Sequence, residues 1–417
     1  MSKIVLINVS GHDQPGLTAS LTGVLSRYGV RILDIGQAVI HDTLSLGLLV
    51  QIPDRFEDSV ALRDVRTHLE AARLQARFTP VTAADYEAWV AERGKSLYVI
   101  TVLGRQIEAE HLHRIAQVVS ANRLNIEDIQ RLTRRISLHP GAPPQQACLQ
   151  LTVRGAATDP EAMQREFMAI AQELGVDIAF QREGLFRRNR RLMVFDMDST
   201  LIRHEVIDEL AAAAGVGAEV AAITAAAMRG ELDFKESFRR RVALLAGLDA
   251  AALPALVARL QLTAGVERLF KYLKLLGYKT AVVSGGFSYF GRHLQQRLGI
   301  DHVHANELEI VAGRITGRVV GEIIDGPRKA ELLAQIAARE GIDLEQVVAV
   351  GDGANDLPML RLAGLGIAFH AKPIVRATAR QSISTIGLDG ILYLLGLRDF
   401  ETSDPAADAA ATGPSGC

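Results

Sequence analysis

Two carboxylates, Asp196 and Asp198, follow the apolar run 192–195 with one residue between them. Side chains alternate along a strand, so both acids are predicted to project to the same side, about 6.6 Å apart along the chain. Such a pair can divide a reaction, because one carboxylate can attack while the other moves a proton. Alone, the pattern also fits a strand that ends in a turn, where Asp, Ser and Thr bond the backbone or cap the next helix.

From residue 191 onward, short apolar runs alternate with helical stretches, which indicates a parallel sheet covered on both faces. The four runs span residues 192–195, 280–283, 346–350 and 365–369. Ligand sites in open α/β sheets lie beyond the carboxyl ends of the strands. Asp196, Ser284 and Asp352, which follow three of these runs, are therefore predicted to meet in one crevice.

The residues of this crevice are of the types that phosphoryl transfer needs, which are a nucleophile, a proton donor and groups that bind the phosphoryl oxygens. Asp196 is the candidate nucleophile that would form an aspartyl-phosphate. Asp198 is the candidate acid for the leaving alkoxide and would later accept a proton from water. Ser284 and Gly285 begin a Ser-Gly-Gly turn, in which glycines allow backbone N–H groups to approach an anion. Lys329 is predicted to open a helix, where a nearby anion would offset its unfavourable interaction with the helix dipole.

Residues 351–356, Gly-Asp-Gly-Ala-Asn-Asp, form a tight polar loop directly after an apolar run. Their carboxylates and amide are oxygen ligands that suit a hard cation. Together with Asp196, Asp352 is predicted to form a Mg²⁺ site, because Mg²⁺ usually takes one or two carboxylates plus phosphate oxygens and water. A network of Asx turns is the alternative for any one of these residues.

Residues 203–275, an Ala-rich stretch of helical pattern, separate the first two strands and are far longer than a crossover needs. This length predicts an inserted helical cap that closes over a small substrate. Glu205 shares the polar face of its helix with Asp208 and Glu209, so the pattern by itself predicts a solvated side chain.

Arg241 lies on the apolar face of a predicted cap helix. At about 100° per residue, Phe234, Phe238 and Leu245 fall on one stripe near 0°, 40° and 20°, and Arg241 falls at about −20°. An unpaired buried charge costs several kcal/mol, so this guanidinium needs an anionic partner. A protein carboxylate and a substrate carboxylate are equally good candidates.

The N-terminal residues 1–185 contain a weak internal repeat, since Val-Arg-Ile-Leu-Asp-Ile at 30–35 recurs as Leu-Asn-Ile-Glu-Asp-Ile at 124–129. Each copy follows a β-type run, a glycine turn and an amphipathic helix pattern, and precedes alternating strands and another helix pattern. The sequence therefore predicts two βαββαβ modules in tandem.

Length and composition predict a globular protein of two or three domains, because the chain has 417 residues of which 48% are hydrophobic. The formal net charge of −2 gives no general electrostatic reason to expect nucleic acid or an anionic membrane as a partner. The basic stretch 187–191 is predicted to be a solvated linker or an interface stretch. Segment 400–417, rich in Ala with Pro, Gly and Ser, is predicted to be a disordered tail.

Two cysteines, Cys148 and Cys417, are too few for a disulfide framework and favour a reducing compartment. The N-terminus becomes polar after a short apolar run, so we expect neither a signal peptide nor a membrane span there. Cytoplasmic localisation is the resulting expectation.

Residues 191 to about 395 resemble the haloacid dehalogenase superfamily and, within it, the phosphoserine phosphatases. The strings that carry the resemblance are Phe-Asp-Met-Asp-Ser-Thr-Leu at 195–201, Glu-Val-Ile-Asp-Glu at 205–209, Phe-Arg-Arg-Arg-Val at 238–242, Val-Ser-Gly-Gly-Phe at 283–287, Lys329, and Val-Gly-Asp-Gly-Ala-Asn-Asp at 350–356. Several motifs in the family's order make the resemblance specific.

The resemblance implies a binding site for O-phosphoserine. Glu205 would hold the ammonium group of the substrate, and Arg241 would hold its carboxylate. Ser284, Gly285 and Lys329 would bind the phosphate. The resemblance thus favours the substrate as the partner of Arg241.

The resemblance also implies a Mg²⁺ shell. Asp352 would complete it together with Asp196 and the backbone carbonyl of Asp198. Asn355 and Asp356 would support that shell or the phosphoryl oxygens.

The N-terminal half resembles two tandem ACT domains, which are βαββαβ modules that often bind amino acids at dimer interfaces. The first copy carries Gly-His-Asp-Gln-Pro-Gly-Leu at 11–17, close to the family's ligand loop, which makes Asp13 and Gly16 candidate effector residues. The second copy has Glu-Ala at 108–109 where the first has Pro-Gly at 15–16, so we expect a structural or dimerisation role there. The first loop also fits a tight turn that caps a helix.

We therefore predict an α/β protein with a doubly wound, parallel-sheet (Rossmann-like) phosphatase core and an inserted helical cap, preceded by two ferredoxin-like ACT domains. The expected boundaries are 1–88 and 95–185 for the ACT domains, 190–202 and 276–398 for the core, 203–275 for the cap and 400–417 for the tail.

The expected activity is Mg²⁺-dependent hydrolysis of O-phosphoserine, the last step of serine synthesis, in a cytoplasmic homodimer whose ACT domains bind serine or another amino acid. One alternative is a related phosphatase or phosphotransferase that acts on phosphothreonine or phosphohomoserine. The cap side chains Met228, Phe234 and Phe238 would decide between these substrates. Another alternative is an amino-acid-sensing regulator with an inert phosphatase domain, against which intact Asp196 and Lys329 argue.

Overall fold

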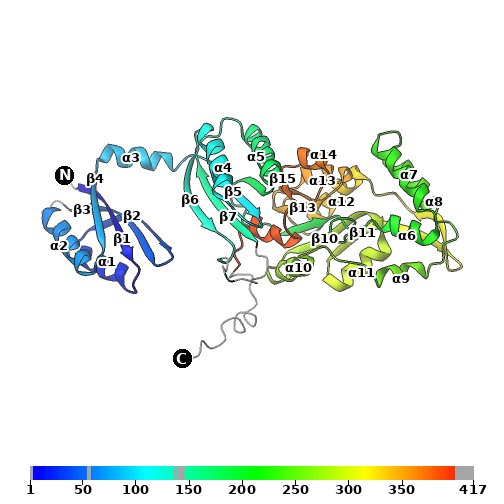
Figure 1. Ribbon diagram of the computed structural model, residues 1–417, viewed down its shortest axis with the longest axis horizontal. Helices are drawn as coiled ribbons and strands as arrows, with labels where there is room; N and C mark the ends of the chain where they lie inside the picture. Colours follow the sequence, from blue (N-terminus) through cyan, green and yellow to red (C-terminus); the bar gives the residue numbers. More distant parts are fainter. Residues whose placement is uncertain (1–2, 54–57, 136–138, 140–145, 400–417) are drawn as a thin grey trace, which may run out of the picture. The chain divides into compact units, whose positions relative to one another are not determined.

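The structure is a computed structural model that describes residues 3–53, 58–135, 139 and 146–399 (Figure 1). Contacts between residues divide the chain into two compact units, residues 1–95 and 96–417. The predicted disordered tail, 400–417, lies outside the described residues. Within the part of the chain that is described, no helix is both long and apolar enough to cross a membrane.

The first unit contains one βαββαβ module, as the internal repeat predicts, and we call it the first module. Its elements are β1 (Lys3–His12), α1 (Leu17–Arg27), β2 (Arg31–Ile40), β3 (Thr43–Ile52), α2 (Asp58–Ala71) and β4 (Gln75–Val81). The strands form one antiparallel sheet in the order β2-β3-β1-β4. Helix α3 (Ala83–Glu92) follows this sheet, begins at a Thr82 cap and buries none of its side chains.

The second unit begins with a second βαββαβ module, which we call the second module. Its elements are β5 (Leu97–Gly104), α4 (Ala109–Ala121), β6 (Asn125–Arg131), β7 (Ala147–Arg154), α5 (Pro160–Leu174) and β8 (Asp177–Arg182). The sheet order β6-β7-β5-β8 repeats that of the first module. The register shifts between Ile32 and Asp34 in β2 and between Ile126 and Asp128 in β6. The two bulges stand at equivalent places of the repeated hexapeptide, which confirms the tandem repeat.

A seven-stranded sheet forms the centre of the remaining chain, in the order β12-β11-β10-β9-β13-β14-β15. The strands are β9 (Leu192–Phe195), β10 (Lys279–Phe287), β11 (His302–Val311), β12 (Arg314–Val320), β13 (Val347–Gly351), β14 (Leu365–Phe369) and β15 (Gln381–Ile383). Neighbouring strands are parallel except for the β11–β12 hairpin. Met193 and Phe195 of β9 pack into one apolar cluster, whereas Leu192 and Val194 pack into another. The central strand is therefore buried on both faces, as its continuous apolar run predicts.

Helices cover this sheet, and together they form what we call the core domain (Figure 1). The helices are α10 (Val266–Leu275), α11 (Ser288–Leu298), α12 (Gly326–Arg339), α13 (Leu357–Leu362), α14 (Pro373–Thr378) and α15 (Ile391–Leu394). Short 3₁₀ turns span Leu344–Gln346, Ala354–Asp356 and Leu388–Gly390. The doubly wound α/β class is thus confirmed, with β12 as an antiparallel edge strand that the apolar runs did not reveal.

A helical insertion, the cap, follows β9. It contains α6 (Val206–Ala214), α7 (Gly217–Met228), α8 (Phe234–Ala243) and α9 (Ala252–Val257). A β-bridge between Ile202 and Leu262 joins its entry and its exit. The next helix, α10, packs Phe270 against Phe195 of β9, with ring centroids 5.1 Å apart. We therefore propose that the cap ends before α10, rather than at residue 275 as the helical pattern suggested.

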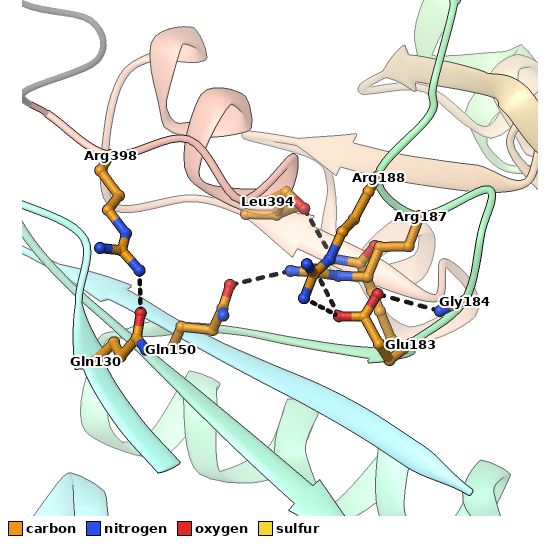
Figure 2. Close-up of polar contacts among 9 residues, drawn as sticks. Gln130, Gln150, Glu183, Gly184, Arg187, Arg188, Leu394 and Arg398 are labelled. Carbon is orange, nitrogen blue, oxygen red and sulfur yellow. Dashed lines mark hydrogen bonds and ion pairs between the residues drawn. The ribbon is translucent and has the colours of Figure 1, made fainter. Parts of the chain in front are cut away.

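The second module and the core domain are joined by the basic stretch 187–191. Arg187 is 4% exposed and donates to Glu183 Oε2 and Gln150 Oε1, each at 3.1 Å. Figure 2 shows this arginine between the sheet of the second module and the C-terminal segment, where Gln181 also donates to the Leu394 carbonyl. The stretch is an interface with buried guanidinium groups, which fits the second of the two roles predicted for it.

Candidate active site

Three strand ends bring the predicted catalytic residues together. β9 lies between β10 and β13, and its last residue, Phe195, pairs with Val282 on one side and Val350 on the other. The Asp196 N–H donates to the carbonyl oxygen of Val350 at 2.9 Å, which fixes the start of the first loop. Asp196 and Asp352, which follow β9 and β13, therefore lie at the same edge of the sheet as Ser284. The prediction that Ser284 begins a turn after its strand was wrong, because β10 continues through the Ser-Gly-Gly stretch to Phe287, with a register shift between Val283 and Phe287.

Lys329 is the central cation of this site. Its side chain is fully buried, and its Nζ lies 2.8 Å from Asp196 Oδ1 and 2.6 Å from Asp356 Oδ1. Burial alone would lower the pKa of Lys329, but the two carboxylates raise it above its ordinary value. The prediction that Lys329 opens its helix was wrong, because α12 begins at Gly326 after an Asp325 cap. Two carboxylates, rather than an anion at a helix end, balance the ammonium.

Three acids form a tight cluster beside this lysine. Carboxylate oxygens of Asp196, Asp352 and Asp356 all lie within 4.8 Å of one another. Burial, followed by repulsion from Asp196, raises the pKa of Asp352 to about 8 and that of Asp356 to about 6. Lys329 supplies one positive charge against three carboxylates, so the cluster carries excess negative charge. Its oxygen donors and its charge fit a divalent cation such as Mg²⁺.

Asp198 is buried, but its carboxylate is not part of that cluster. A Cβ built on Gly286 would come within 2.6 Å of Asp198 Oδ2, so the carboxylate lies against the Ser-Gly-Gly stretch of β10. Its Oδ1 is buried without a hydrogen-bond partner among the described residues. Burial, and then repulsion from Glu205 and Asp196, raises the pKa of Asp198 well above its ordinary value. A carboxyl group in this environment holds a proton, as a general acid must.

Ser199 and Thr200 connect the loop that begins at Asp196 to its surroundings. The Ser199 backbone has φ 57°, a left-handed conformation that costs an L residue about 1–2 kcal/mol. Its hydroxyl donates to Glu205 Oε1 at 2.9 Å. The buried Thr200 hydroxyl lies 3.4 Å from Asp352 Oδ1. Backbone strain of this kind is typical of functional loops, and here it directs two side chains toward predicted site residues.

Asn306 fixes the Ser-Gly-Gly stretch through the two hydrogen bonds of its side-chain amide. Its Nδ2 donates to the Gly285 carbonyl at 2.8 Å, and its Oδ1 accepts from the Ile324 N–H at 2.9 Å. Ser284 is buried, and its Oγ accepts from the Gly286 N–H at 2.9 Å. Sequence reasoning missed Asn306, because it lies inside β11, a strand that the apolar runs did not reveal.

The cap closes over this stretch through Phe234. A Cβ on Gly285 would lie 3.2 Å from the Phe234 ring and 4.0 Å from Asn355 Nδ2. The Phe234 ring stacks with that of Phe238, with centroids 6.2 Å apart. Met228 is 65% exposed, so of the three cap side chains predicted to shape the pocket, this one lies out in solvent.

Arg241 is the charged residue of the cap face. It is partly buried on the side of α8 that also buries Phe238, whereas Arg239 and Arg240 are exposed, as the helical stripe predicts. Its Nε is buried without a hydrogen-bond partner, and no carboxylate of the described residues lies within 4.0 Å of the guanidinium. Burial lowers the pKa of Arg241, and the field of Glu205 opposes that shift. Among the described residues, the guanidinium therefore has no carboxylate in direct contact, although Glu205 acts on it from a distance.

Glu205 stands at the entrance of the cap, in the N-cap position of α6, and it is exposed as its helix pattern predicts. Partial loss of hydration raises the pKa of Glu205, while the hydrogen bond from Ser199 and the charge of Lys372 oppose that rise. Sequence reasoning missed Lys372, because a single exposed lysine after a strand carries no distinctive pattern.

The two predicted effector residues belong to the other compact unit. The Asp13 N–H donates to the Asp42 carbonyl at 2.8 Å, and Asp13 is partly exposed. Gly16 has φ 90° and precedes α1 directly, and a Cβ added to it would meet no atom within 4 Å. The loop caps a helix, as the alternative interpretation states, and it also leaves Gly16 exposed.

Known families match separate parts of the chain. The haloacid dehalogenase-like hydrolases match residues 193–361, which include the acidic cluster, Lys329 and the cap. ACT domains match residues 3–79 and 96–181, which correspond to the first and second modules.

Relatives of known activity extend over almost the whole chain. A phosphoserine phosphatase of Streptomyces coelicolor is 43% identical, over 98% of this chain and 97% of the relative. The chain belongs to the phosphoserine phosphatase family of haloacid dehalogenase-like hydrolases. Another family member, the phosphoserine phosphatase of Mycobacterium tuberculosis, is 44% identical, over 98% of this chain and 96% of the relative. Family membership confirms the predicted fold class and enzyme class.

Solved structures of the family agree with the fold. A haloacid dehalogenase family hydrolase from Salmonella enterica serovar Typhi has a TM-score of 0.61 and 32% identity, covering 71% of this chain and 98% of its own. A probable phosphoserine phosphatase from Vibrio cholerae, in an unliganded form, has a TM-score of 0.56 and 34% identity, covering 73% and 87%.

Proposed function

We propose that this chain hydrolyses O-phosphoserine to serine and phosphate through a phosphorylated Asp196, the last step of serine synthesis. One observation carries the choice of substrate. Beside the Asp196 and Asp198 pair, the cap presents the guanidinium of Arg241, which forms no ion pair with the residues that the structure describes, and an exposed carboxylate, Glu205. These two charges are complementary to the carboxylate and the ammonium of an amino acid.

Asp196 supplies the attacking oxygen. Its carboxylate attacks phosphorus in line with the ester oxygen, so that the bond from phosphorus to the serine oxygen breaks as a bond to Asp196 forms. The ion pair with Lys329, 2.8 Å long, holds the carboxylate in place. Lys329 also lies where it can neutralise a phosphoryl oxygen.

Asp198 moves the protons of both half-reactions. In the first, it gives its proton to the departing serine alkoxide. In the second, it takes a proton from the water that attacks phosphorus and releases phosphate from Asp196. Its raised pKa supports this role, because a carboxyl group with an ordinary pKa would be ionised at neutral pH before the first step.

Mg²⁺ is the cofactor that we assign to the acidic cluster. Asp196 and Asp352 would hold it together with the backbone carbonyl of Asp198. Asp356 would support the arrangement, since its two oxygens already accept from Lys329 at 2.6 Å and from the Gly353 N–H at 2.9 Å. The bound ion would neutralise negative charge on the transferred phosphoryl group.

Ser284 and the stretch around Gly285 are the phosphate-binding groups of this proposal, and Asn355 supports them from the loop after β13. The support for this is their position, since Gly285 lies between the cap ring of Phe234 and the amide of Asn355. Glycine fits this place without any shift of the cap, because a Cβ there would lie only 3.2 Å from the Phe234 ring.

The test is a phosphate-release assay with two substrates that differ by one carboxylate. O-phosphoserine should be turned over in the presence of Mg²⁺ and not after chelation with EDTA, and O-phosphoethanolamine should be a poor substrate. Equal turnover of both substrates would remove the assignment to an amino acid. Faster turnover of O-phosphothreonine than of O-phosphoserine would favour the related phosphatase instead.

We also propose that the first module binds serine through the loop with Asp13 and Gly16, in a homodimer. The exposed edge strand β2, whose Ile32, Ile35 and Ile40 are 43%, 47% and 80% exposed, supports pairing with a second copy. The content of two cysteines in 417 residues supports a reducing, cytoplasmic setting. Calorimetry with serine should show binding that Gly16→Val removes, and absence of heat with the unchanged protein would exclude a serine sensor.

A further inference from the structure

A cavity of about 530 Å³ lies between the second module and the core domain, and none of the residues assigned to the catalytic site lines it. One wall is helix α5 with the start of β8, and the other is α14 with the segment 382–385. Both walls belong to the same compact unit. The volume is within the range of small-molecule sites in proteins.

Part of this cavity is apolar. Val176 and Ile178 line it and are each 3% exposed, and Met168 of α5 lines it beside them. This apolar wall favours a ligand with a hydrocarbon or aromatic body, because binding there removes the apolar surface of the ligand from water.

Two arginines give the cavity its charge. Arg165 lines it from α5 and Arg376 lines it from α14. Among the described residues, no carboxylate lies within 4.0 Å of either guanidinium. The one acid that lines the cavity, Asp177, is already occupied as an acceptor. Its oxygens bind the Ser384 N–H at 2.8 Å, the Thr385 N–H at 2.9 Å and the Thr385 hydroxyl at 2.5 Å.

Two hydroxyls complete the polar side. Ser382 and Ser384 line the cavity and have their oxygens 3.2 Å apart, where one hydrogen bond joins them. One of the two protons is therefore left over as a donor. Two guanidinium groups and a free hydroxyl proton are groups that bind an anion.

We propose that this cavity binds a small organic anion with an apolar body, such as an aromatic carboxylate, sulfonate or phosphate monoester. The guanidinium groups of Arg165 and Arg376 would hold the anionic group, and the wall around Val176 would hold the apolar body. This site is distinct from the catalytic crevice and from the loop of the first module.

The position of the cavity gives such a ligand contact with both domains. The Ser384 and Thr385 wall is bonded to Asp177 of the second module. After Thr385 the chain continues to Ile386, whose carbonyl oxygen lies 3.0 Å from His370 Nε2. His370 follows β14 and stands two residues before Lys372, whose charge acts on Glu205. A bound ligand would thus touch Ser384 and Thr385, which directly precede the contact between Ile386 and His370.

The probe for the test is 8-anilinonaphthalene-1-sulfonate, which carries an aromatic body and one anionic group. Its fluorescence should rise to saturation on titration of the full chain. The double variant Arg165→Glu/Arg376→Glu should bind it at least about tenfold more weakly. Arg361→Glu/Arg380→Glu is the matched control, because it makes the same change of charge at two exposed arginines that do not line the cavity.

Two further experiments distinguish binding in the cavity from nonspecific binding of the probe. Ala169→Trp, at an exposed position of the rim, should also weaken the probe without changing any charge. 1-Naphthoate should displace the probe, whereas the neutral 1-naphthalenemethanol should not. Equal binding by the cavity variants and the control, or equal displacement by the two naphthalenes, would overturn the proposal. Circular dichroism checks that each variant is folded. If either the double arginine variant or Ala169→Trp fails to fold, the other of these two cavity variants decides the test.

Discussion

Arg241 is the residue on which the choice of substrate depends. Replacement by Ala should raise the KM for O-phosphoserine by about 10- to 100-fold, because a charge-assisted hydrogen bond to the substrate carboxylate is lost. Turnover of O-phosphoethanolamine, which has no carboxylate, should change little. Arg239→Ala is the matched control, since Arg239 lies on the same helix and is exposed. Parallel loss with both substrates would mean that Arg241 supports the cap and does not recognise the carboxylate.

Single residues of the site were predictable where the pattern of strands fixes their position. Asp196 follows an apolar run directly, Asp352 follows another after Gly351, and Arg241 stands out because it interrupts an apolar stripe. The environment of Lys329 was not predictable, because its burial depends on Asp356, which arrives from a separate loop. Contacts of this kind are set by tertiary packing and leave no mark on the local sequence.

The Ser-Gly-Gly stretch of β10 is the element that sets the distance between Asp198, the proposed proton donor, and the proposed phosphate-binding groups. A Cβ on Gly286 would lie 2.6 Å from Asp198 Oδ2 and 2.7 Å from the methyl carbon of Met197. Gly286→Ala should therefore displace Asp198 and lower kcat by about 10²-fold, since a shift near 1 Å has that effect in active sites. Steady-state kinetics with O-phosphoserine measures the kcat of this variant.

Gly184→Ala is the control for that variant, because a Cβ there meets nothing within 4 Å and the backbone φ is not positive. It should retain the activity of the unchanged protein. An unaltered kcat in Gly286→Ala would show that the stretch can yield without disturbing Asp198, and the close packing would then have no catalytic meaning.

Strands made of continuous apolar residues were predictable, and strands with polar or exposed positions were not. The runs predicted β9 and β14 with their observed bounds, because strands buried on both faces must be apolar throughout. β15 spans only Gln381–Ile383, and its polar first residue belongs to an interface. The hairpin of β11 and β12 carries exposed and polar positions, so periodicity could not separate it from a loop.

At the scale of the whole molecule, the joint between the second module and the core domain depends on Gln381. This buried amide accepts from the Phe180 N–H at 3.0 Å and donates to the Phe180 carbonyl at 2.7 Å. Gln381→Leu should leave both backbone groups unpaired and lower the free energy of unfolding by about 1–3 kcal/mol. Urea unfolding of the full chain measures this against Gln296→Leu, a change at an exposed glutamine. Equal midpoints for the two variants would mean that the joint does not limit stability.

The arrangement in tandem modules was predictable from the repeat, whereas the joint was not. The repeated hexapeptide marks the same bulge in both sheets, and such local features survive in sequence. By contrast, the contact between Gln381 and Phe180 links positions far apart in the chain, and Arg187 is buried only because Gln150 and Glu183 meet it there. The sequence of the basic stretch alone could not distinguish a solvated linker from this interface.

The central claim is that Asp196 carries the phosphoryl group during turnover, and one measurement tests it most directly. The enzyme is mixed with O-phosphoserine labelled in its phosphate and Mg²⁺, quenched in acid, digested and mapped by mass spectrometry. The label should appear on the peptide that contains Asp196, and Asp196→Asn should show neither label nor turnover. Label on another residue, or turnover that persists in Asp196→Asn, would contradict the account.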